Sequence, residues 1–354
     1  MVKFPGIGIP KPEEVLPPII KRNYGKWISH EFGKAGILKH ISETGEECIT
    51  IRIGMPTNGR VSTDTLNKIC DLADEYADGY FRVTTRNHVE FVGVKEDKID
   101  SLISKLGNIG LPVGGTGRRF HQTTCCTGWL HCQLAATDSP SVAKAISDNF
   151  YEEFISENEP FPAKLKISVA GCLNQCGEGS TADIGAVGVY REAPRVKDEA
   201  VKACEISTTI RVCPVGAIRP KGKETILINP DRCIYCGYCM MTCEAITMVP
   251  ETAGLAIVVG GKAGNTGDGP AWAKVAVHYL PNNPPGWEET VEVIRRIVDV
   301  WKNDAQKDER IREWINRIGW EKFFEKTNIK VNLKHVDGLL GGTRNVRSNV
   351  RFRW

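Results

Sequence analysis

The sequence predicts an α+β protein in which a small cysteine-rich unit is inserted into a larger module. Two observations lead to this prediction. Short runs with the alternation typical of strands are mixed with runs that have helical spacing, and the first of them follow the order strand, helix, strand, strand, helix. In addition, 11 of the 13 cysteines lie between Cys125 and Cys243, and the composition changes at about residue 201.

The N-terminal part of the chain divides at about residue 40. Residues 1–40 contain many prolines and predict an extended arm. Residues 41–112 predict, in order, strand Cys48–Ile53, helix Thr63–Ala77, strands Tyr80–Thr84 and His88–Val94, and helix Ile99–Leu106. This β-α-β-β-α order is typical of one half of a split, ferredoxin-like unit.

The remaining segments are predicted from turns, periodicity and cysteine content. Residues 113–200 contain a glycine turn at Gly114–Arg119, a helix at Ser141–Ser156 and a strand at Lys164–Ala170. The cysteine-rich unit occupies residues 201–250. Strands return within residues 251–285, at Gly254–Gly261 and Ala273–Leu280, and residues 286–354 predict helices from Glu288 to about Phe324 followed by a basic tail.

The composition is that of an ordinary globular protein. The 354 residues are 41% hydrophobic and 25% charged, and the formal net charge is only +3. This charge is too small to predict binding to nucleic acid, and no apolar run approaches the ~20 residues that a membrane span requires. Near the N-terminus two adjacent glutamates stand in place of the basic and apolar regions of a signal peptide, so we expect a cytoplasmic protein.

The expected compartment decides how the cysteines are interpreted. In a reducing cytoplasm, clustered thiols bind metal or carry out redox chemistry more often than they form disulfides. Cys48 and Cys70 stand alone in the sequence and are predicted to be buried structural residues.

The cysteine-rich unit has the spacing of a bacterial ferredoxin. Its cysteines follow the pattern C-x2-C-x2-C-x3-C over residues 233–243, and Cys213 is followed by proline as in the fourth ligand of such proteins. We therefore predict a [4Fe–4S] cluster held by Cys213, Cys233, Cys236 and Cys239. Cys243 is followed by glutamate and is left outside this set, and Cys204 is predicted to be a buried thiol. The alternative is a structural zinc site, although zinc sites usually space their cysteine pairs farther apart.

A second set of four thiols lies upstream of the cysteine-rich unit. It consists of the pair Cys126-x5-Cys132 and the pair Cys172-x3-Cys176, and Cys125 is a plausible substitute for Cys126. By themselves these two pairs indicate only a metal ion or a cluster.

The surroundings of the second set resemble the siroheme-dependent sulfite and nitrite reductases, and among them the β subunits of dissimilatory sulfite reductases. The matching stretches are GCLNQC at residues 171–176, GWLHC at 128–132, KRNYGKW at 21–27 and RIGWEKFF at 317–324. The resemblance extends over essentially the whole chain. It implies a sulfite reductase half-module, made of a split ferredoxin-like part and a siroheme-binding α+β domain, with an inserted [4Fe–4S] ferredoxin domain.

The resemblance also implies the cofactors and the role of one cysteine. It implies siroheme and two [4Fe–4S] clusters, with Cys176 bridging the iron of the second set's cluster and the siroheme iron. The sequence departs from many such β subunits in one respect. Those subunits lack the first cysteine of the Cys-x5-Cys pair and have a cysteine directly before the position of Cys172, where this chain has Gly171.

Basic residues of the chain match those that the family uses around a dianionic substrate. Lys164 and Lys166 lie on one face of a predicted strand, Arg52 matches the arginine of the first strand, and Arg119, in preference to Arg118, matches the second arginine. Two further arginines, Arg82 and Arg86, resemble those that bind siroheme carboxylates. His121 and His131 are predicted to be structural, with proton donation as the alternative.

The function implied by the resemblance is the multi-electron reduction of sulfite toward sulfide, with electrons entering through the ferredoxin domain. The chain has only one half-module, so the resemblance implies an α2β2 assembly with an α subunit, and a small sulfur-carrier protein of the DsrC type as a further partner. The alternatives are a siroheme nitrite reductase and a two-cluster electron-transfer subunit without a tetrapyrrole. The motifs are the same for sulfite reduction and for the reverse, oxidative direction.

Overall fold

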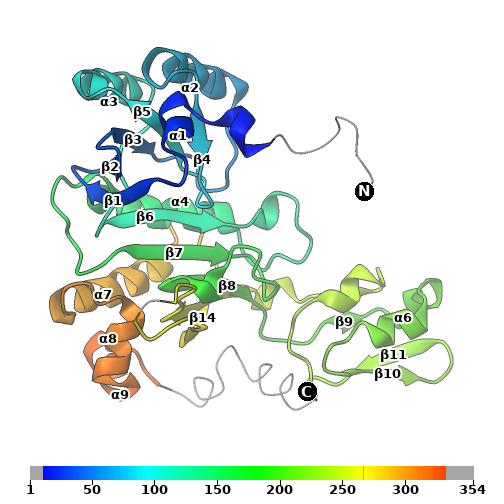
Figure 1. The fold of residues 1–354 in the computed structure, drawn as a ribbon. Helices are drawn as coiled ribbons and strands as arrows, with labels where there is room; N and C mark the ends of the chain where they lie inside the picture. The colour runs from blue at the N-terminus through cyan, green and yellow to red at the C-terminus, as the bar shows by residue number, and fades with distance from the viewer. Residues whose placement is uncertain (1–10, 266, 332–354) are drawn as a thin grey trace. The chain divides into compact units, whose positions relative to one another are not determined.

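The computed structural model describes residues 11–265 and 267–331 (Figure 1). The chain forms two compact units. The first contains residues 1–122 and 150–164, and the second contains residues 123–149 and 165–354. The α+β class predicted from the sequence is confirmed, because each unit is built on a largely antiparallel five-stranded sheet with helices packed against it.

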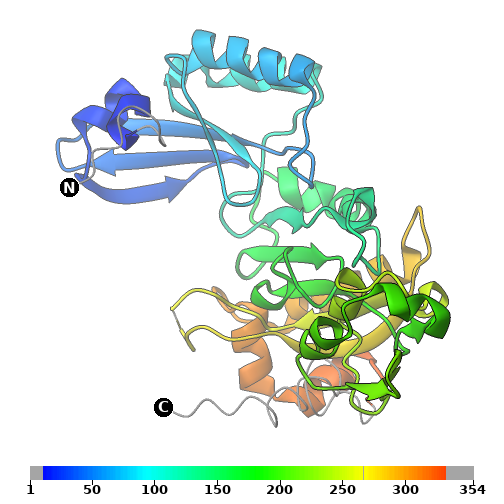
Figure 2. The ribbon, with the colours of Figure 1, turned by 90° about the vertical axis from the view of Figure 1, so that its right-hand side faces the viewer.

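The first unit is the predicted ferredoxin-like half. Its sheet has the order β1-β2-β3-β5-β4, and all of the neighbouring strands are antiparallel. The strands are β1 Trp27–Phe32, β2 Ile37–Ser42, β3 Glu47–Ile53, β4 Phe81–Val83 and β5 Val89–Val94, and the helices are α2 Thr63–Tyr76 and α3 Ile99–Asn108. Both helices pack on one face of this sheet through a core that includes Ile51, Phe91 and Leu102 (Figure 2).

The alternation of β3 and β5 leaves polar side chains on the other face of this sheet. Ile51, Ile53 and Phe91 point into the core, so Arg52 and Glu90 point away from it. A pocket on this polar face is bordered by the segment that contains η1 Pro12–Val15 and α1 Pro18–Arg22 and by the side chains of Arg82 and Glu90. The sheet therefore separates an apolar core from a face that carries charge.

The N-terminal segment differs from the predicted extended arm. Residues 27–32 and 37–42 form β1 and β2, which extend the sheet beyond β3. Prolines cluster only before residue 19, whereas the later residues of the segment contain a short turn at Lys34–Gly36 that permits a hairpin. Proline content over the first half of this segment was a poor guide to the second half.

The sheet of the second unit carries the cysteine loops. Its order is β14-β13-β8-β7-β6, with β7 and β8 parallel and β8, β13 and β14 antiparallel to their next neighbours. The strands are β6 Phe120–Cys125, β7 Leu165–Ala170, β8 Ile184–Val189, β13 Gly254–Val259 and β14 Lys274–Pro281. The predicted helix at Ser141–Ser156 is divided into α4 Ser139–Asn149 and α5 Tyr151–Ile155, because Phe150 leaves the helical conformation.

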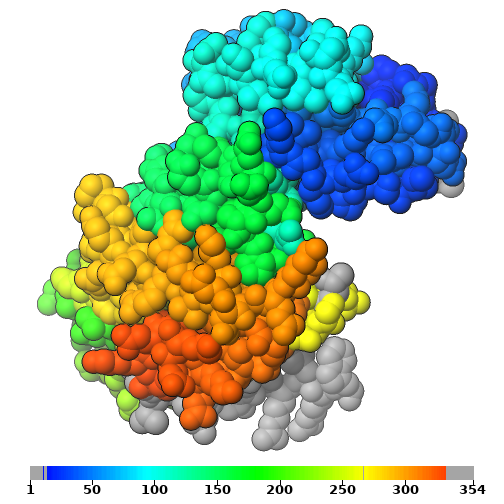
Figure 3. Space-filling model, turned by 90° about the vertical axis from the view of Figure 1, so that its left-hand side faces the viewer, coloured from blue at the N-terminus to red at the C-terminus, as the bar shows by residue number. Residues whose placement is uncertain are grey.

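The helices predicted from Glu288 to about Phe324 are three in the described part of the second unit. They are α7 Glu288–Asp304, α8 Ile311–Ile318 and α9 Trp320–Thr327. Figure 3 shows them as one continuous orange and red surface. Trp287, Trp301 and Trp314 are completely buried, and the indole nitrogen of Trp287 donates to Ser141 Oγ of α4 at 2.8 Å. The predicted tail at residues 341–354 lies outside the described residues.

The cysteine-rich unit is a set of short elements inserted between β8 and β13. They are β9 Arg195–Val196, η5 Asp198–Ala203, α6 Ile206–Arg211, β10 Ile218–Lys221, β11 Thr225–Ile228, η6 Tyr238–Met241 and β12 Ile246–Thr247. Strands β10 and β11 form a hairpin, and β12 pairs with β9. The small core between them includes Val201, Ile218 and Ile226.

None of the helices in the described parts of the chain combines the length and the apolar character that crossing a membrane requires.

Candidate functional site

The upstream set of thiols gathers at one edge of the second unit's sheet. Cys126 directly follows β6, Cys132 follows the short helix η3 Gly128–Leu130, and Cys172 and Cys176 follow β7. Burial in the first place, and then the neighbouring Cys132, Cys126 and Cys176 sulfurs, together raise the pKa of the Cys172 thiol to about 11, against a backbone N–H of Asn174 that lowers it. The four predicted sulfurs are therefore close enough to act on one another electrostatically.

The contacts of Cys126 and the position of Cys125 distinguish these two neighbouring cysteines. Its sulfur accepts a hydrogen bond from the backbone N–H of Gly171 at 3.1 Å, and Ser139 Oγ lies 3.4 Å away. Cys125 is the last residue of β6, whereas the Cys126 sulfur is one of the groups that raise the pKa of Cys172. The geometry therefore favours Cys126 over Cys125 as the ligand.

Gly171 accounts for the departure from the family pattern noted above. A Cβ atom at residue 171 would lie 3.3 Å from Cys126 Sγ and 2.9 Å from Ser139 Oγ. A side chain at residue 171 would therefore compete for the space that the Cys126 thiol occupies. The space beside the Cys126 thiol is therefore open because residue 171 is glycine.

The loop between Cys172 and Cys176 is held by local hydrogen bonds. Gln175 lies in the left-handed region with φ 53°, and its side-chain oxygen accepts from the backbone N–H of Ser180 at 2.9 Å and from the Ser180 hydroxyl at 2.5 Å. Among the four thiols of this set, Cys176 is exposed and the other three are partly buried.

The second set of thiols gathers within the cysteine-rich unit. Burial in the first place, and then Cys236, Cys233 and Cys213, together raise the pKa of the Cys239 thiol to about 12. Cys213 Sγ accepts from the backbone N–H of Ala217 at 3.1 Å, and the backbone N–H of Tyr238 donates to Cys236. All four cysteines border one small cavity.

Both sets provide the donor chemistry of an iron–sulfur cluster. Thiols with a raised pKa stay protonated near neutral pH unless a cation stabilises the thiolate, and cluster iron supplies that positive charge. Backbone N–H groups that donate to sulfur are a common feature of such sites and tune their reduction potentials. No group of three or more His, Cys, Asp or Glu side chains arranged to hold a metal ion is found within residues 11–265 and 267–331.

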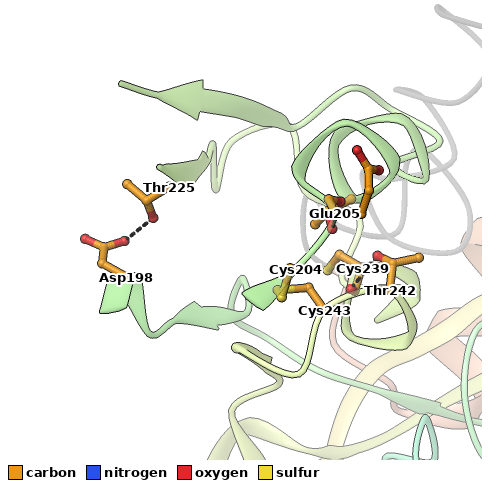
Figure 4. The surroundings of a disulfide bond; sticks show 8 residues. Asp198, Cys204, Glu205, Thr225, Cys239, Thr242 and Cys243 are labelled. Carbon is orange, nitrogen blue, oxygen red and sulfur yellow. Dashed lines mark hydrogen bonds between the residues drawn. A yellow bond between two sulfur atoms is a disulfide. The ribbon is translucent and has the colours of Figure 1, made fainter. Parts of the chain in front are cut away.

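Cys204 and Cys243 form a disulfide, so the prediction that Cys204 is a buried free thiol was wrong. Figure 4 shows this bond beside Cys239, between the segment before α6 and the end of η6. The backbone N–H of Cys243 also donates to the carbonyl of Cys239 at 3.2 Å. The disulfide is therefore connected to the loop that carries the predicted ligand Cys239. The available signal was arithmetic, because these are the two cysteines of the cysteine-rich unit that remain after its ligand set is assigned.

In the first unit, two of the predicted arginines share one carboxylate. Arg52 and Arg82 are the cross-strand neighbours of Glu90. Arg52 donates twice to Glu90 Oε1, at 2.8 and 2.7 Å, and once to the carbonyl of Gly115 at 2.9 Å. Arg82 lies 3.4 Å from Glu90 Oε2 with 67% of its side chain exposed. Glu90 was missed from the sequence, although its place on β5 puts it on the same face as Arg52.

The other arginines near the glycine turn differ in their surroundings. Arg86 donates to the carbonyl of Gln122 at 3.0 and 3.2 Å. Arg119 is 1% exposed and donates to the carbonyls of Ser156, Glu157 and Thr116 at 2.6, 2.8 and 3.1 Å. Arg118 forms an ion pair with Glu159 at 2.7 Å. Arg119 thus ties the turn to the segment that follows α5, and its substrate role stays a prediction.

Burial lowers the pKa of two histidines of the first unit, of which His88 is fully buried and His121 is partly buried. Burial in the first place, together with the charges of Arg52 and Arg86, lowers the pKa of His88 to about 3. Its Nδ1 lies 3.1 Å from the carbonyl of Ile53, and its ring stacks on Phe154. Burial also lowers the pKa of His121 well below its usual value, and its Nε2 lies 3.1 Å from the carbonyl of Gly117. His131 is exposed and lies 3.2 Å from Thr127 Oγ1.

The predicted lysines lie at the start of β7. The backbone N–H of Lys166 donates to Asp183 Oδ2 at 2.8 Å, and Asp183 Oδ1 accepts from Arg310 at 2.8 Å. Lys164 belongs to the first unit, as do the predicted arginines Arg52, Arg82, Arg86 and Arg119, whereas Lys166 belongs to the second unit. Within the second unit the structure gathers each predicted thiol set, and within the first it joins Arg52 and Arg82 through Glu90.

Comparisons with known proteins agree with this arrangement. Residues 116–335 match the model of the nitrite and sulphite reductase 4Fe-4S domain, and residues 40–109 match the nitrite/sulfite reductase ferredoxin-like half domain. The chain is 39% identical to a sulfite reductase, dissimilatory-type subunit beta, of Archaeoglobus fulgidus, over 98% of this chain and 97% of the relative. It is 38% identical to the protein of the same description in Nitratidesulfovibrio vulgaris, over 94% of this chain and 90% of the relative.

A solved structure supports the fold. The crystal structure of dissimilatory sulfite reductase I superposes with a TM-score of 0.81 at 21% identity and covers 90% of this chain and 81% of that chain. The two family models and the identity of 38–39% along nearly the whole chain show the family, and the two thiol sets agree with it. The chain therefore belongs to the nitrite and sulphite reductase family, among the dissimilatory-type beta subunits.

Proposed function

We propose that this chain is the β-type subunit of a dissimilatory sulfite reductase that reduces sulfite toward sulfide. The observation that carries the proposal is the pair of four-thiol sets in the second unit, one at the sheet edge and one in an inserted ferredoxin-like unit. This pairing occurs in a chain that is 39% identical to a dissimilatory-type subunit beta along nearly its whole length.

The upstream thiol set fits a [4Fe–4S] cluster that shares one ligand with siroheme. Cys126, Cys132 and Cys172 are partly buried, whereas Cys176 is exposed. Cys176 is therefore the sulfur best placed to be shared with the iron of a macrocycle bound outside the loop. When bound, siroheme would supply the iron to which sulfite binds and a store of electrons for its reduction.

The cationic residues are proposed to act on anions. Arg82 and Arg86 would bind siroheme carboxylates, because guanidinium groups pair with carboxylates in a bidentate manner. Arg52, Arg119, Lys164 and Lys166 would stabilise the sulfite dianion and hold protons for the oxygens that leave as water. Glu90 fixes Arg52 and Arg82 before any ligand arrives, so their guanidinium groups need little reorganisation on binding.

The assembly is proposed on the basis of the half-module. The relatives are described as beta subunits, and this chain contains one ferredoxin-like half domain, so we propose an α2β2 complex with an α subunit. The cysteine-rich unit would hold the second [4Fe–4S] cluster and receive electrons, and a small sulfur-carrier protein of the DsrC type would accept the product. A reducing cytoplasm would keep both thiol sets available for iron.

The test is a comparison of absorption spectra of purified variants, normalised to protein. The unmodified protein, purified with its partner subunit, should show the visible bands of a tetrapyrrole as well as the broad absorption of iron–sulfur clusters. Cys176→Ser should change both, because it removes the shared thiolate. Cys132→Ser, the matched control in the same ligand set, should mainly affect the cluster absorption.

Two results would count against the proposal. Absence of tetrapyrrole bands in the unmodified complex would favour an electron-transfer subunit with clusters alone. Equal effects of the two substitutions on the tetrapyrrole bands would mean that the cluster is lost as a unit in both variants, and Cys176 would then have no special role.

A further inference from the structure

The two thiol sets are joined by a contact between their loops. Tyr238, at the start of η6 in the cysteine-rich unit, donates a short hydrogen bond from its hydroxyl to Asn174 Oδ1 in the loop between Cys172 and Cys176. The two residues are 64 positions apart in the sequence and both belong to the second unit. We call this contact the Tyr238–Asn174 bridge.

The bridge is anchored to a cysteine at each end. The backbone N–H of Tyr238 donates to the thiol of Cys236, and the backbone N–H of Asn174 donates to the thiol of Cys172. A continuous path of covalent and hydrogen bonds therefore runs from Cys236 through Tyr238 and Asn174 to Cys172.

The backbone around the bridge allows the loops to approach closely. Gly237, directly before Tyr238, has φ 78°, and a Cβ atom there would lie 3.2 Å from Leu134 Cδ2. Leu134 follows Cys132 by two residues, so the loop of the cysteine-rich unit packs against the segment that carries a ligand of the other set. A residue other than glycine would be strained in this conformation, and the Leu134 side chain would have to shift by a few tenths of an ångström.

We propose that the Tyr238–Asn174 bridge holds the two cluster loops together and forms the path by which electrons move between them. This inference rests on the proposed function, because it requires a cluster in each thiol set. One electron supplied by an external one-electron donor would leave the reduced cluster of Cys213, Cys233, Cys236 and Cys239, which is thereby oxidised. The cluster of Cys126, Cys132, Cys172 and Cys176 would accept it. Tyr238 and Asn174 are positioning residues, and neither is oxidised.

The experiment compares Tyr238→Phe with the unmodified protein, purified with its partner subunit. The substitution keeps the aromatic ring and removes only the hydroxyl. The first measurement is hydrogen exchange of the backbone amides of residues 172–176, which should become about fivefold faster, the ratio that corresponds to the loss of one neutral hydrogen bond. The second is the rate of electron equilibration between the clusters after rapid mixing with dithionite, followed by electron paramagnetic resonance of freeze-quenched samples. This rate should fall by about fivefold, because the bridged geometry is less populated to that extent.

Two variants make the result specific. Tyr235→Phe removes a phenol hydroxyl that lies one residue before Cys236 and makes no hydrogen bond to Asn174 in the described part of the chain, and it should change neither measurement. Asn174→Ala removes the acceptor and should reproduce the effects of Tyr238→Phe. The double variant Tyr238→Phe/Asn174→Ala should be no slower than either single variant, because both substitutions break the same bond.

The outcomes separate the bridge from the proposed function. Iron content and the visible bands should be unchanged in Tyr238→Phe. If both clusters are present and the electron equilibration rate of Tyr238→Phe equals that of the unmodified protein, the bridge is not the electron path. If exchange at residues 172–176 is also unchanged, it does not hold the loops together. If the unmodified protein lacks either cluster, the proposed function itself fails, which iron analysis reveals before the variants are compared.

Discussion

At the scale of single residues, the first unit contains a histidine that the fold keeps neutral. His88 is 1% exposed, its ring stacks on Phe154, and Arg52 and Arg86 disfavour a further positive charge beside it. Its Nδ1 donates to the carbonyl of Ile53, since a carbonyl can only accept, and its Nε2 has no hydrogen-bond partner among the described residues. The neutral ring therefore fits this position, and a proton would have to be accommodated beside two arginines.

This environment makes stability depend on pH. The pKa of His88 is about 3 in the folded chain against 6.5 for an ordinary histidine, so between these values the unfolded chain binds a proton that the folded chain does not. The free energy of unfolding should therefore fall as the pH falls below about 6.5, by about 2 kcal/mol between pH 7.5 and pH 5 for this one group. His88→Gln should remove that part of the pH dependence, as measured by urea unfolding at both pH values.

The matched control for this prediction is His30→Gln, because His30 is exposed in the same unit. It should leave the pH dependence as it is in the unmodified protein. His121, whose pKa is also lowered, would still contribute a pH dependence of the same sign. If unfolding of His88→Gln had the same pH dependence as the unmodified protein, His88 would not be a buried neutral group.

At the scale of elements, the sheet of the second unit is locked to the C-terminal helices by a buried carboxylate. Asp183 is 1% exposed and directly precedes β8. Its side chain accepts from Lys166 at the start of β7 and from Arg310, which directly precedes α8. Its carbonyl accepts from Gly260 after β13 at 2.9 Å. Three strands and a helix are therefore held by one residue, which also fixes the backbone that carries Lys166.

Replacing this carboxylate should be costly. Asp183→Asn removes the charge partner of Arg310, whose side chain is only 12% exposed, and we expect a loss of about 3–5 kcal/mol in the free energy of unfolding. Chemical denaturation measures this loss. The double variant Asp183→Asn/Arg310→Met should be less destabilised, because no uncompensated buried charge remains.

A surface pair in the same unit provides the control. Asp299 and Arg295 lie 4.0 Å apart on α7, and the Asp299 side chain is 52% exposed. Asp299→Asn should therefore cost less than about 1 kcal/mol. A similar small loss for Asp183→Asn would show that Asp183 does not lock the strands to α8.

At the scale of the whole molecule, the two thiol sets come from separate stretches of chain. The upstream set is built on β6, β7 and η3, whereas the second set belongs to the insertion with its own core and its own disulfide. The two sets also meet through the bridge, the packing of Leu134 on Gly237 and a small apolar cluster of Ala136, Tyr190 and Met248, but the ligands of each set lie on local elements of their own. The sets should therefore assemble independently.

Cys236→Ser tests this independence. Loss of one ligand should remove the cluster of the insertion and lower the iron content by about four atoms per chain, the content of one [4Fe–4S] cluster. The visible bands assigned to the tetrapyrrole should remain. Iron analysis and absorption spectra of the purified complex measure both. Simultaneous loss of all chromophores would mean that the insertion is needed for the other site to form.

The sequence by itself determined the features that depend on local spacing. The ferredoxin run of cysteines, the Cys-x3-Cys pair after a strand, and the helices and strands of residues 48–108 follow from patterns within a few residues, and the structure places them where those patterns predict. Local spacing fails at Phe150. The backbone of this residue leaves the helical conformation and divides a helix that was predicted to be continuous.

Only the tertiary structure decided which distant groups meet. Cys204 and Cys243 are separated by 39 positions and form a disulfide, and Tyr238 meets Asn174 across 64 positions. Glu90 unites Arg52 and Arg82 because three strands place them side by side, and Asp183 meets Arg310 across 127 positions. The physical reason is that periodicity fixes the face on which a side chain lies, whereas its partner is fixed by strand order and loop packing, which the whole chain determines together.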